Sequence, residues 1–210
     1  MTTRDEIKAK IRVLAELQSA KLKSAIDERV IEMEGDEVSH YLIYRVLGIG
    51  EAEGKAIDVY QNKGRFLYKY AGAFLETATK LCFEQSFPGS ASFRIDNTIG
   101  QRPKKFEIDC LVGNDALEIK WKDATTDGDH ITKEHTRIRV IHAAGYVPIR
   151  VMFYYPNRTQ AMRIQQALEA LYKSVGGQYY FGAAAWDFVA KRTKIPLLAL
   201  LEEIAAEKSK

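Results

Sequence analysis

The segment from Phe106 to Lys122 has the residue types and spacing of a hydrolytic site. Asp109 lies in the first of two strand-like runs, and Glu118 and Lys120 lie two apart in the second. Residues two apart on a strand point to the same face, so Glu118 and Lys120 are predicted to project together. A turn at Gly113-Asn114-Asp115 would bring Asp109 back beside them. Two carboxylates and a lysine at one edge of a sheet can hold Mg²⁺ and orient an attacking water, which is the chemistry of phosphodiester hydrolysis.

The alternative interpretation of E-I-K is the solvated face of an edge strand, where Glu and Lys commonly alternate. Three features favour the catalytic interpretation. An aspartate lies on the preceding strand, and a helix that carries Glu76 comes before the hairpin. The flanking residues are apolar enough for an interior sheet: Leu111, Val112, Leu117 and Ile119.

Hydrophobic periodicity and turn residues predict the elements that position these side chains. Helices are expected over 4–30, 37–47, 65–84, 130–144, 159–175, 183–191 and 195–207, and strands over 92–95, 106–122 (the hairpin) and 147–155. Residues 48–64 are rich in Gly and charge and are expected to form a loop or a short irregular element, and loops are expected over 101–105 and 123–129. This order predicts an α/β core with helical extensions at both ends.

The pattern of a helix with Glu, then D-x8-E-x-K on paired strands, then a helix and a strand, resembles the PD-(D/E)XK nuclease superfamily. The resemblance implies a restriction-endonuclease-like core, a central mixed β-sheet flanked by helices. It assigns catalysis to Asp109, Glu118 and Lys120, with help from Glu76, and places Mg²⁺ on Asp109, Glu118 and the main-chain carbonyl of Ile119. The family's proline before the aspartate is replaced here by Ile108, which makes the motif less distinct. The implied organisation is a single nuclease domain over 1–210, with a helical extension (1–60), a catalytic core (64–155) and a helical C-terminal part (157–210).

More narrowly, the run from Ala116 to Arg137 (A-L-E-I-K-W-K-D-A-T-T-D-G-D-H-I-T-K-E-H-T-R) is similar to type II restriction endonucleases of the ApaLI-like group. That likeness implies a homodimer that cuts a short palindrome in double-stranded DNA with Mg²⁺ and leaves 5′-phosphates. A cognate DNA methyltransferase in the host is also implied.

Cations and polar side chains near the hairpin are candidate DNA contacts, because duplex binding needs cations for phosphates and polar groups for base edges. An ordinary solvated turn is the alternative for Arg102, Lys104 and Lys105. Asp127-Gly128-Asp129 lacks the bidentate glutamate of a calcium loop, and His130 and His135 have no third zinc ligand in view. The candidates are Arg102, Lys104, Lys105, Lys122, Asp123, Thr125, Thr126, Asp127, His130, Lys133, His135 and Arg137.

Bulk properties limit the class of protein. The 210 residues are enough for one substantial core, and a net charge of +3 permits nucleic-acid binding without requiring it. Two cysteines make neither a disulfide framework nor a zinc site, and no signal peptide or membrane span is visible. We therefore expect a prokaryotic cytoplasmic protein with no membrane partner.

Two other functions remain open at this point. One is a repair or recombination nuclease on the same core, and the other is a non-catalytic DNA-binding module. A wide separation of Asp109 and Glu118 would favour the non-catalytic module.

Overall fold

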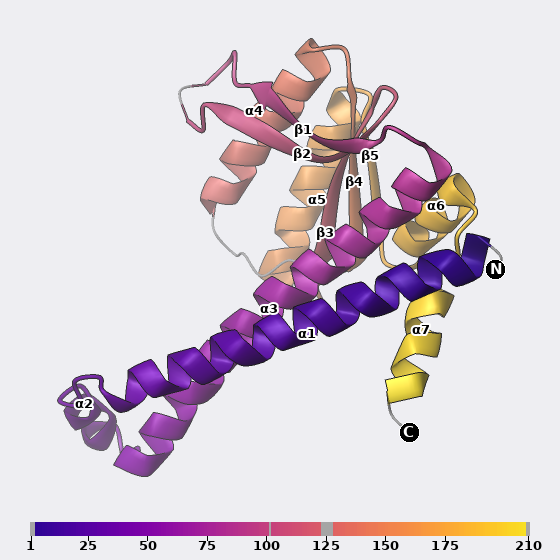
Figure 1. Cartoon of the computed structure of the whole chain (residues 1–210). Coiled ribbons are helices and arrows are strands. Elements are labelled where there is room, and N and C mark those ends of the chain that lie inside the picture. The colour runs from indigo at the N-terminus through magenta and orange to yellow at the C-terminus, as the bar shows by residue number, and fades with distance from the viewer. Residues whose placement is uncertain (1–2, 101, 123–127, 209–210) are drawn as a thin grey trace. The chain divides into compact units, whose positions relative to one another are not determined.

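The computed structural model describes residues 3–100, 102–122 and 128–208 (Figure 1). The chain divides into two compact units: Val13–Phe74, and a larger unit made of Met1–Arg12 and Leu75–Lys210. The long helices α1 (Thr3–Glu34) and α3 (Glu51–Ser86) each contribute to both units. Among the described residues, no helix is both long enough and apolar enough to cross a membrane.

The smaller unit contains most of α1, the short helix α2 (Tyr41–Val46) and the first part of α3. Gly54 of α3 lies against α2, where a Cβ would come within 2.5 Å of Tyr44 Cδ2. The neighbouring Asp58 accepts a hydrogen bond from Tyr44 Oη at 3.0 Å. Glycine is needed here for close packing rather than for a break in the helix.

Two predictions for this unit require correction. The predicted loop over 48–64 is wrong, because α3 begins at Glu51 and continues without interruption for 36 residues. The helix predicted over 37–47 is shorter, since α2 covers only Tyr41–Val46.

A five-stranded mixed sheet forms the centre of the larger unit, in the order β1-β2-β3-β4-β5. The strands β1, β2 and β3 are antiparallel neighbours, whereas β3-β4 and β4-β5 are parallel. Gly113, with φ 59°, supplies the positive φ of the β2-β3 turn. The parallel pairs need crossover connections, which helices α4 and α5 provide. The strands are β1 (Ala91–Asp96), β2 (Lys105–Val112), β3 (Asp115–Lys122), β4 (Val147–Tyr154) and β5 (Gln178–Phe181).

Helices cover both faces of this sheet. On one face, α4 (Gly128–Ala143) and α5 (Thr159–Ser174) pack on a buried cluster that includes Ile138, Met152 and Leu168. The next residue of β4, Phe153, points to the opposite face, where its ring lies 4.2 Å from Trp186 of α6 (Ala183–Thr193). The predicted mixed α/β sheet with flanking helices is thereby confirmed at the level of architecture.

The C-terminal part contains one element that the sequence analysis missed. Residues 157–210 were predicted to be helical, yet Gln178–Phe181 forms β5, which pairs in parallel with β4. The last helix, α7 (Leu197–Lys208), is bound to the start of α1, where Lys8 Nζ lies 2.8 Å from both Glu203 Oε2 and Glu207 Oε1.

Candidate active site

Strands β2 and β3 separate at the residues predicted to be catalytic. Their pairing runs from Val112↔Asp115 to Cys110↔Leu117, and the next positions outward are Asp109 and Glu118. Beyond this point β2 stays paired with β1, and β3 stays paired with β4. Asp109 turns its side chain into the gap, and its Oδ2 accepts a hydrogen bond from the main-chain N–H of Ile119 at 2.7 Å. The side chain thus replaces a missing ladder bond and is held in one orientation.

Glu118 is almost fully buried and has a cation on each carboxylate oxygen. Lys120 Nζ lies 2.5 Å from Oε1, which confirms that these two side chains share a face of β3. The guanidinium of Arg137, on α4, lies against Oε2. Burial alone would raise the pKa of Glu118, but the charges of Arg137, Lys120 and Arg150 lower it to about 2. The carboxylate is therefore ionised over the whole physiological range.

Asp109 has the opposite electrostatic balance. Burial, with a smaller contribution from the negative charge of Glu118, raises the pKa of Asp109 to about 7. The positive charges of Lys120 and Arg137 oppose this increase but do not cancel it. A perturbed carboxyl beside an ionised one is a pattern common at functional sites. Lys120 and Arg137 do not fully offset the cost of ionising Asp109, so a further positive charge would stabilise the ionised pair of acids.

Lys120 remains protonated at this site. Burial lowers its pKa, but the carboxylates of Glu118 and Asp109 outweigh burial and raise it above the usual 10.5. The side chain keeps about a third of its surface exposed. An ammonium here can donate hydrogen bonds and stabilise negative charge that develops on a substrate.

A second group of charges lies behind Glu118. Glu134 of α4 contacts three side chains: Arg137 Nη1 at 3.4 Å, Arg150 Nη1 at 3.2 Å and Tyr172 Oη at 3.1 Å. Arg150 lies on β4 directly opposite Glu118 in the parallel ladder and is 1% exposed. Sequence reasoning missed this cluster, although an arginine within the apolar run V-P-I-R-V-M-F was a visible signal.

Glu76 lies on α3 and pairs with Lys80, whose Nζ is 3.2 Å from Glu76 Oε1. Its negative charge is among the influences that raise the pKa of Asp109, though the smallest of those identified. Lys80 also donates a hydrogen bond to Ser92 Oγ at 3.0 Å, and Ser92 Oγ donates to the carbonyl of Asp109. Glu76 is thus connected to the strand of Asp109 through two intervening side chains.

Sequence comparison assigns the whole chain to a family. The profile of the ApaLI-like restriction endonucleases matches residues 1–206 of the chain. This chain belongs to the ApaLI-like restriction endonuclease family. It is a type II site-specific deoxyribonuclease, a hydrolase that binds double-stranded DNA, which confirms the predicted resemblance to the ApaLI-like group and the predicted enzyme class. No curated protein and no solved structure matched the chain.

Restriction endonucleases typically use divalent metal ions. Within 3–100, 102–122 and 128–208, no three His, Cys, Asp or Glu side chains gather as a metal cluster. The donor set at the strand separation nevertheless fits a hard cation, because Mg²⁺ is usually held by one or two carboxylates together with waters and phosphate oxygens. Asp109 and Glu118 are two such carboxylates on neighbouring strands of this ApaLI-like chain.

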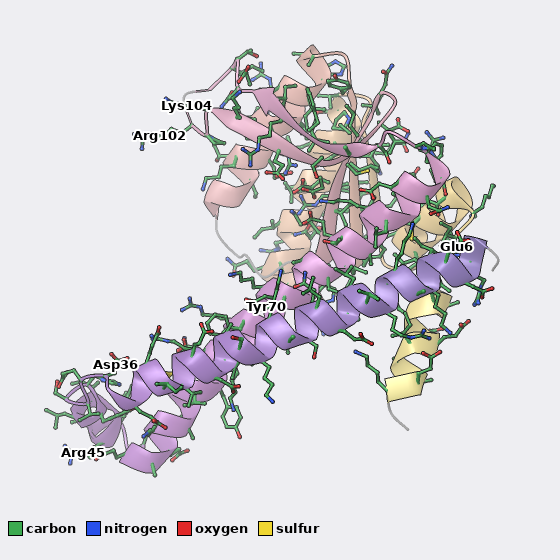
Figure 2. All side chains as sticks on the ribbon, in the orientation of Figure 1. Glu6, Asp36, Arg45, Tyr70, Arg102 and Lys104 are labelled. Carbon is green, nitrogen blue, oxygen red and sulfur yellow. The ribbon has the colours of Figure 1, made fainter. Side chains whose placement is uncertain are left out.

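The predicted DNA contacts of this ApaLI-like chain fall into four groups. Arg102 and Lys104 project outward from the β1-β2 loop (Figure 2), and Lys105 pairs with Asp96 at 3.1 Å. Arg137 lies elsewhere than expected, since its side chain is 11% exposed and contacts Glu118. Lys122, Lys133 and His135 are exposed. Outside the described residues lie Asp123, Thr125, Thr126, Asp127 and the side chain of His130.

Proposed function

We propose that this restriction endonuclease cuts both strands of a short palindrome with Mg²⁺ at Asp109, Glu118 and Lys120, leaving 5′-phosphates. The observation that supports this site is the separation of β2 and β3, where two buried carboxylates and a protonated lysine meet. We propose that these residues form the PD-(D/E)XK site that the sequence resembles. We further propose that the chain acts as a single nuclease domain.

The assignment of metal ligands follows from the bonds that already occupy each carboxylate. Ile119 N–H engages Asp109 Oδ2, so Oδ1 is the oxygen that we assign to the metal. Glu118 Oε2 is covered by the largely enclosed Arg137, whereas Oε1 contacts Lys120, whose side chain is about a third exposed, so Oε1 is the oxygen of Glu118 that we assign to the metal. The main-chain carbonyl of Ile119, between Glu118 and Lys120, is the third proposed ligand. A bound Mg²⁺ would lower the pKa of a coordinated water and stabilise the leaving oxyanion.

Lys120 has a separate role in this proposal. Because its raised pKa keeps it an ammonium, it donates hydrogen bonds to the attacking water and to the scissile phosphate rather than removing a proton. Its contact with Glu118 Oε1 fixes the position of the ammonium before substrate arrives. Glu76 stays a predicted auxiliary acid, supported by its influence on the pKa of Asp109.

DNA binding is proposed for the exposed cations that flank the site. Arg102, Lys104 and Lys105 precede the Asp109 strand, and Lys122 follows Lys120 by two residues. The contacts predicted for residues 123–127 and for His130, Lys133 and His135 are kept as proposals. Two-fold symmetric cleavage calls for a homodimer, and a protective DNA methyltransferase is expected in the prokaryotic cytoplasm that holds the enzyme.

Digestion of phage DNA by the purified chain, with Mg²⁺ and with EDTA in parallel, tests the proposal. Discrete Mg²⁺-dependent fragments with 5′-phosphate ends are expected for the wild type, and no fragments are expected for Asp109→Asn or Glu118→Gln. The exposed substitution Asp187→Asn on α6 is a matched control for loss of one carboxylate and should cut normally. Full activity of Asp109→Asn or Glu118→Gln would contradict the assignment of the site.

A further inference from the structure

A partly buried arginine on α4, Arg137, contacts the proposed metal ligand Glu118 and two neighbouring groups. Arg137 Nη2 lies against Glu118 Oε2 and also donates a hydrogen bond to the main-chain carbonyl of Glu107 on β2. Its other terminal nitrogen, Nη1, lies 3.4 Å from Glu134 Oε1. One planar guanidinium therefore links β2, β3 and α4 at the point where the two strands separate.

The group that anchors Arg137 is itself held firmly. Glu134 Oε2 lies 3.2 Å from Arg150 Nη1 and accepts a hydrogen bond from Tyr172 Oη at 3.1 Å. Arg150 and Tyr172 are each 1% exposed, on β4 and α5 respectively. Since these partners come from the packed interior, Glu134 has little freedom to move, and neither does the guanidinium that it contacts.

We propose that Arg137, anchored by Glu134, is a positioning residue that holds Oε2 of the Glu118 carboxylate and thereby directs Oε1, the oxygen beside Lys120, to the proposed metal. The inference rests on the proposed function, because it assumes that Glu118 is a ligand. A guanidinium suits this task, because its donors are fixed in one plane and can hold two acceptors at set angles. Partners of this kind orient metal ligands and commonly change metal affinity or activity 10–100-fold when removed.

Two other roles for Arg137 make different predictions. A DNA contact would require an accessible guanidinium, but the side chain is 11% exposed and its terminal nitrogens already contact protein oxygens. A cation that merely competes with the metal for Glu118 would weaken metal binding, so its removal would tighten that binding. A positioning residue has the opposite effect.

The test compares Arg137→Gln and Arg137→Lys with Arg139→Gln, which removes an exposed arginine from the same helix. Mn²⁺ binding to the full-length protein is measured by electron paramagnetic resonance, and the half-saturating Mn²⁺ concentration is measured in plasmid cleavage. We expect Arg137→Gln to weaken both by about 10–100-fold. Arg137→Lys should fall short of full rescue, because an ammonium cannot hold the same plane of contacts. Arg139→Gln should match the wild type in both Mn²⁺ measurements.

Unchanged or tighter Mn²⁺ binding in folded Arg137→Gln would overturn the inference. Weaker DNA binding with unchanged Mn²⁺ dependence would overturn it as well, in favour of a DNA contact. If Arg137→Gln does not fold, Arg137→Lys tests the inference in its place, because it keeps the positive charge beside Glu118 and Glu134 without the planar guanidinium. Its Mn²⁺ dependence should stay weakened, and a normal Mn²⁺ dependence would again overturn the inference.

DNA cleavage by the wild type and by Asp109→Asn distinguishes failure of this inference from failure of the proposed function. If the wild type cuts DNA and Asp109→Asn does not, the site is supported whatever Arg137→Gln does. If Asp109→Asn cuts normally, the proposed site fails first, and the role of Arg137 fails with it.

Discussion

Replacing Asp109 by Asn should stabilise the metal-free protein at neutral pH and abolish cleavage at the same time. Asparagine has the same shape, and its side-chain oxygen can accept the hydrogen bond that Ile119 N–H donates to Asp109 Oδ2. The carboxylate itself is unfavourable here, because burial, with a contribution from Glu118, raises the pKa of Asp109 from 3.8 to about 7. The expected gain in stability equals the extra free energy that ionising Asp109 costs in the folded protein, compared with the unfolded chain.

The size and sign of the effect follow from that pKa. A carboxyl whose pKa is higher in the folded state binds its proton more tightly there, so the free energy of unfolding decreases as pH rises above the unfolded value. The decrease ends once pH exceeds the folded value of about 7. At 1.36 kcal/mol for each pH unit, the interval from 3.8 to about 7 corresponds to about 4 kcal/mol. Asparagine does not ionise in this range, so the free energy of unfolding of Asp109→Asn lacks this decrease with pH.

Urea unfolding in EDTA, for both proteins between about pH 4 and about pH 8, measures the effect. The advantage of Asp109→Asn should be small at the acid end, grow as pH rises toward 7, and level off above it. Asp187→Asn, whose parent side chain is 69% exposed, should show no such growth. The reasoning would be refuted by a difference in the free energy of unfolding, between Asp109→Asn and the wild type, that is equal at both ends of the pH range. It would also be refuted if Asp109→Asn were less stable than the wild type at about pH 8.

Three further predictions test the site and the core. Lys120→Ala should fold and bind DNA but cut at least about a hundredfold more slowly in single-turnover assays, and a wild-type rate would remove lysine from the mechanism. Leu168→Ala should lower the free energy of unfolding, measured in urea, by about 2–5 kcal/mol, because Leu168 is fully buried between α5 and the sheet. The control Lys173→Ala replaces an exposed residue of the same helix and should change this free energy by less than about 0.5 kcal/mol. The thiols of Cys82 and Cys110, whose pKa values burial raises to about 12 and about 11, should react with iodoacetamide only on unfolding, and fast labelling of the native protein would contradict their burial.

The sequence predicted most of the elements around the site because their signals are local. The alternation of Glu118 and Lys120 and the glycine of the β2-β3 turn placed the catalytic candidates on one hairpin, as observed. The helix predicted over 130–144 ends at Ala143, within one residue of the prediction, and Gly145, the predicted C′ residue, has a φ of 86°. Periodicity of two or of 3.6 residues, together with turn residues, is sufficient for such elements.

The elements that were missed depend on contacts distant in sequence. Glycines suggested a loop over 48–64, but Gly54 serves the close approach of Tyr44, which no local pattern reveals. Strand β5 is only four residues long, and it forms by pairing with β4 at the edge of the sheet. The position of Arg137 depends on how α4 packs against β3, so a cation predicted to contact DNA instead lies partly buried beside Glu118.

Anomalous diffraction from crystals of the full-length protein grown with Mn²⁺ tests the central claim most directly. We predict a peak between the carboxylates of Asp109 and Glu118, close to the main-chain carbonyl of Ile119, and no such peak in crystals of Asp109→Asn prepared in the same way. A strong peak bound by other side chains, with the gap between β2 and β3 empty, would contradict the proposed active site.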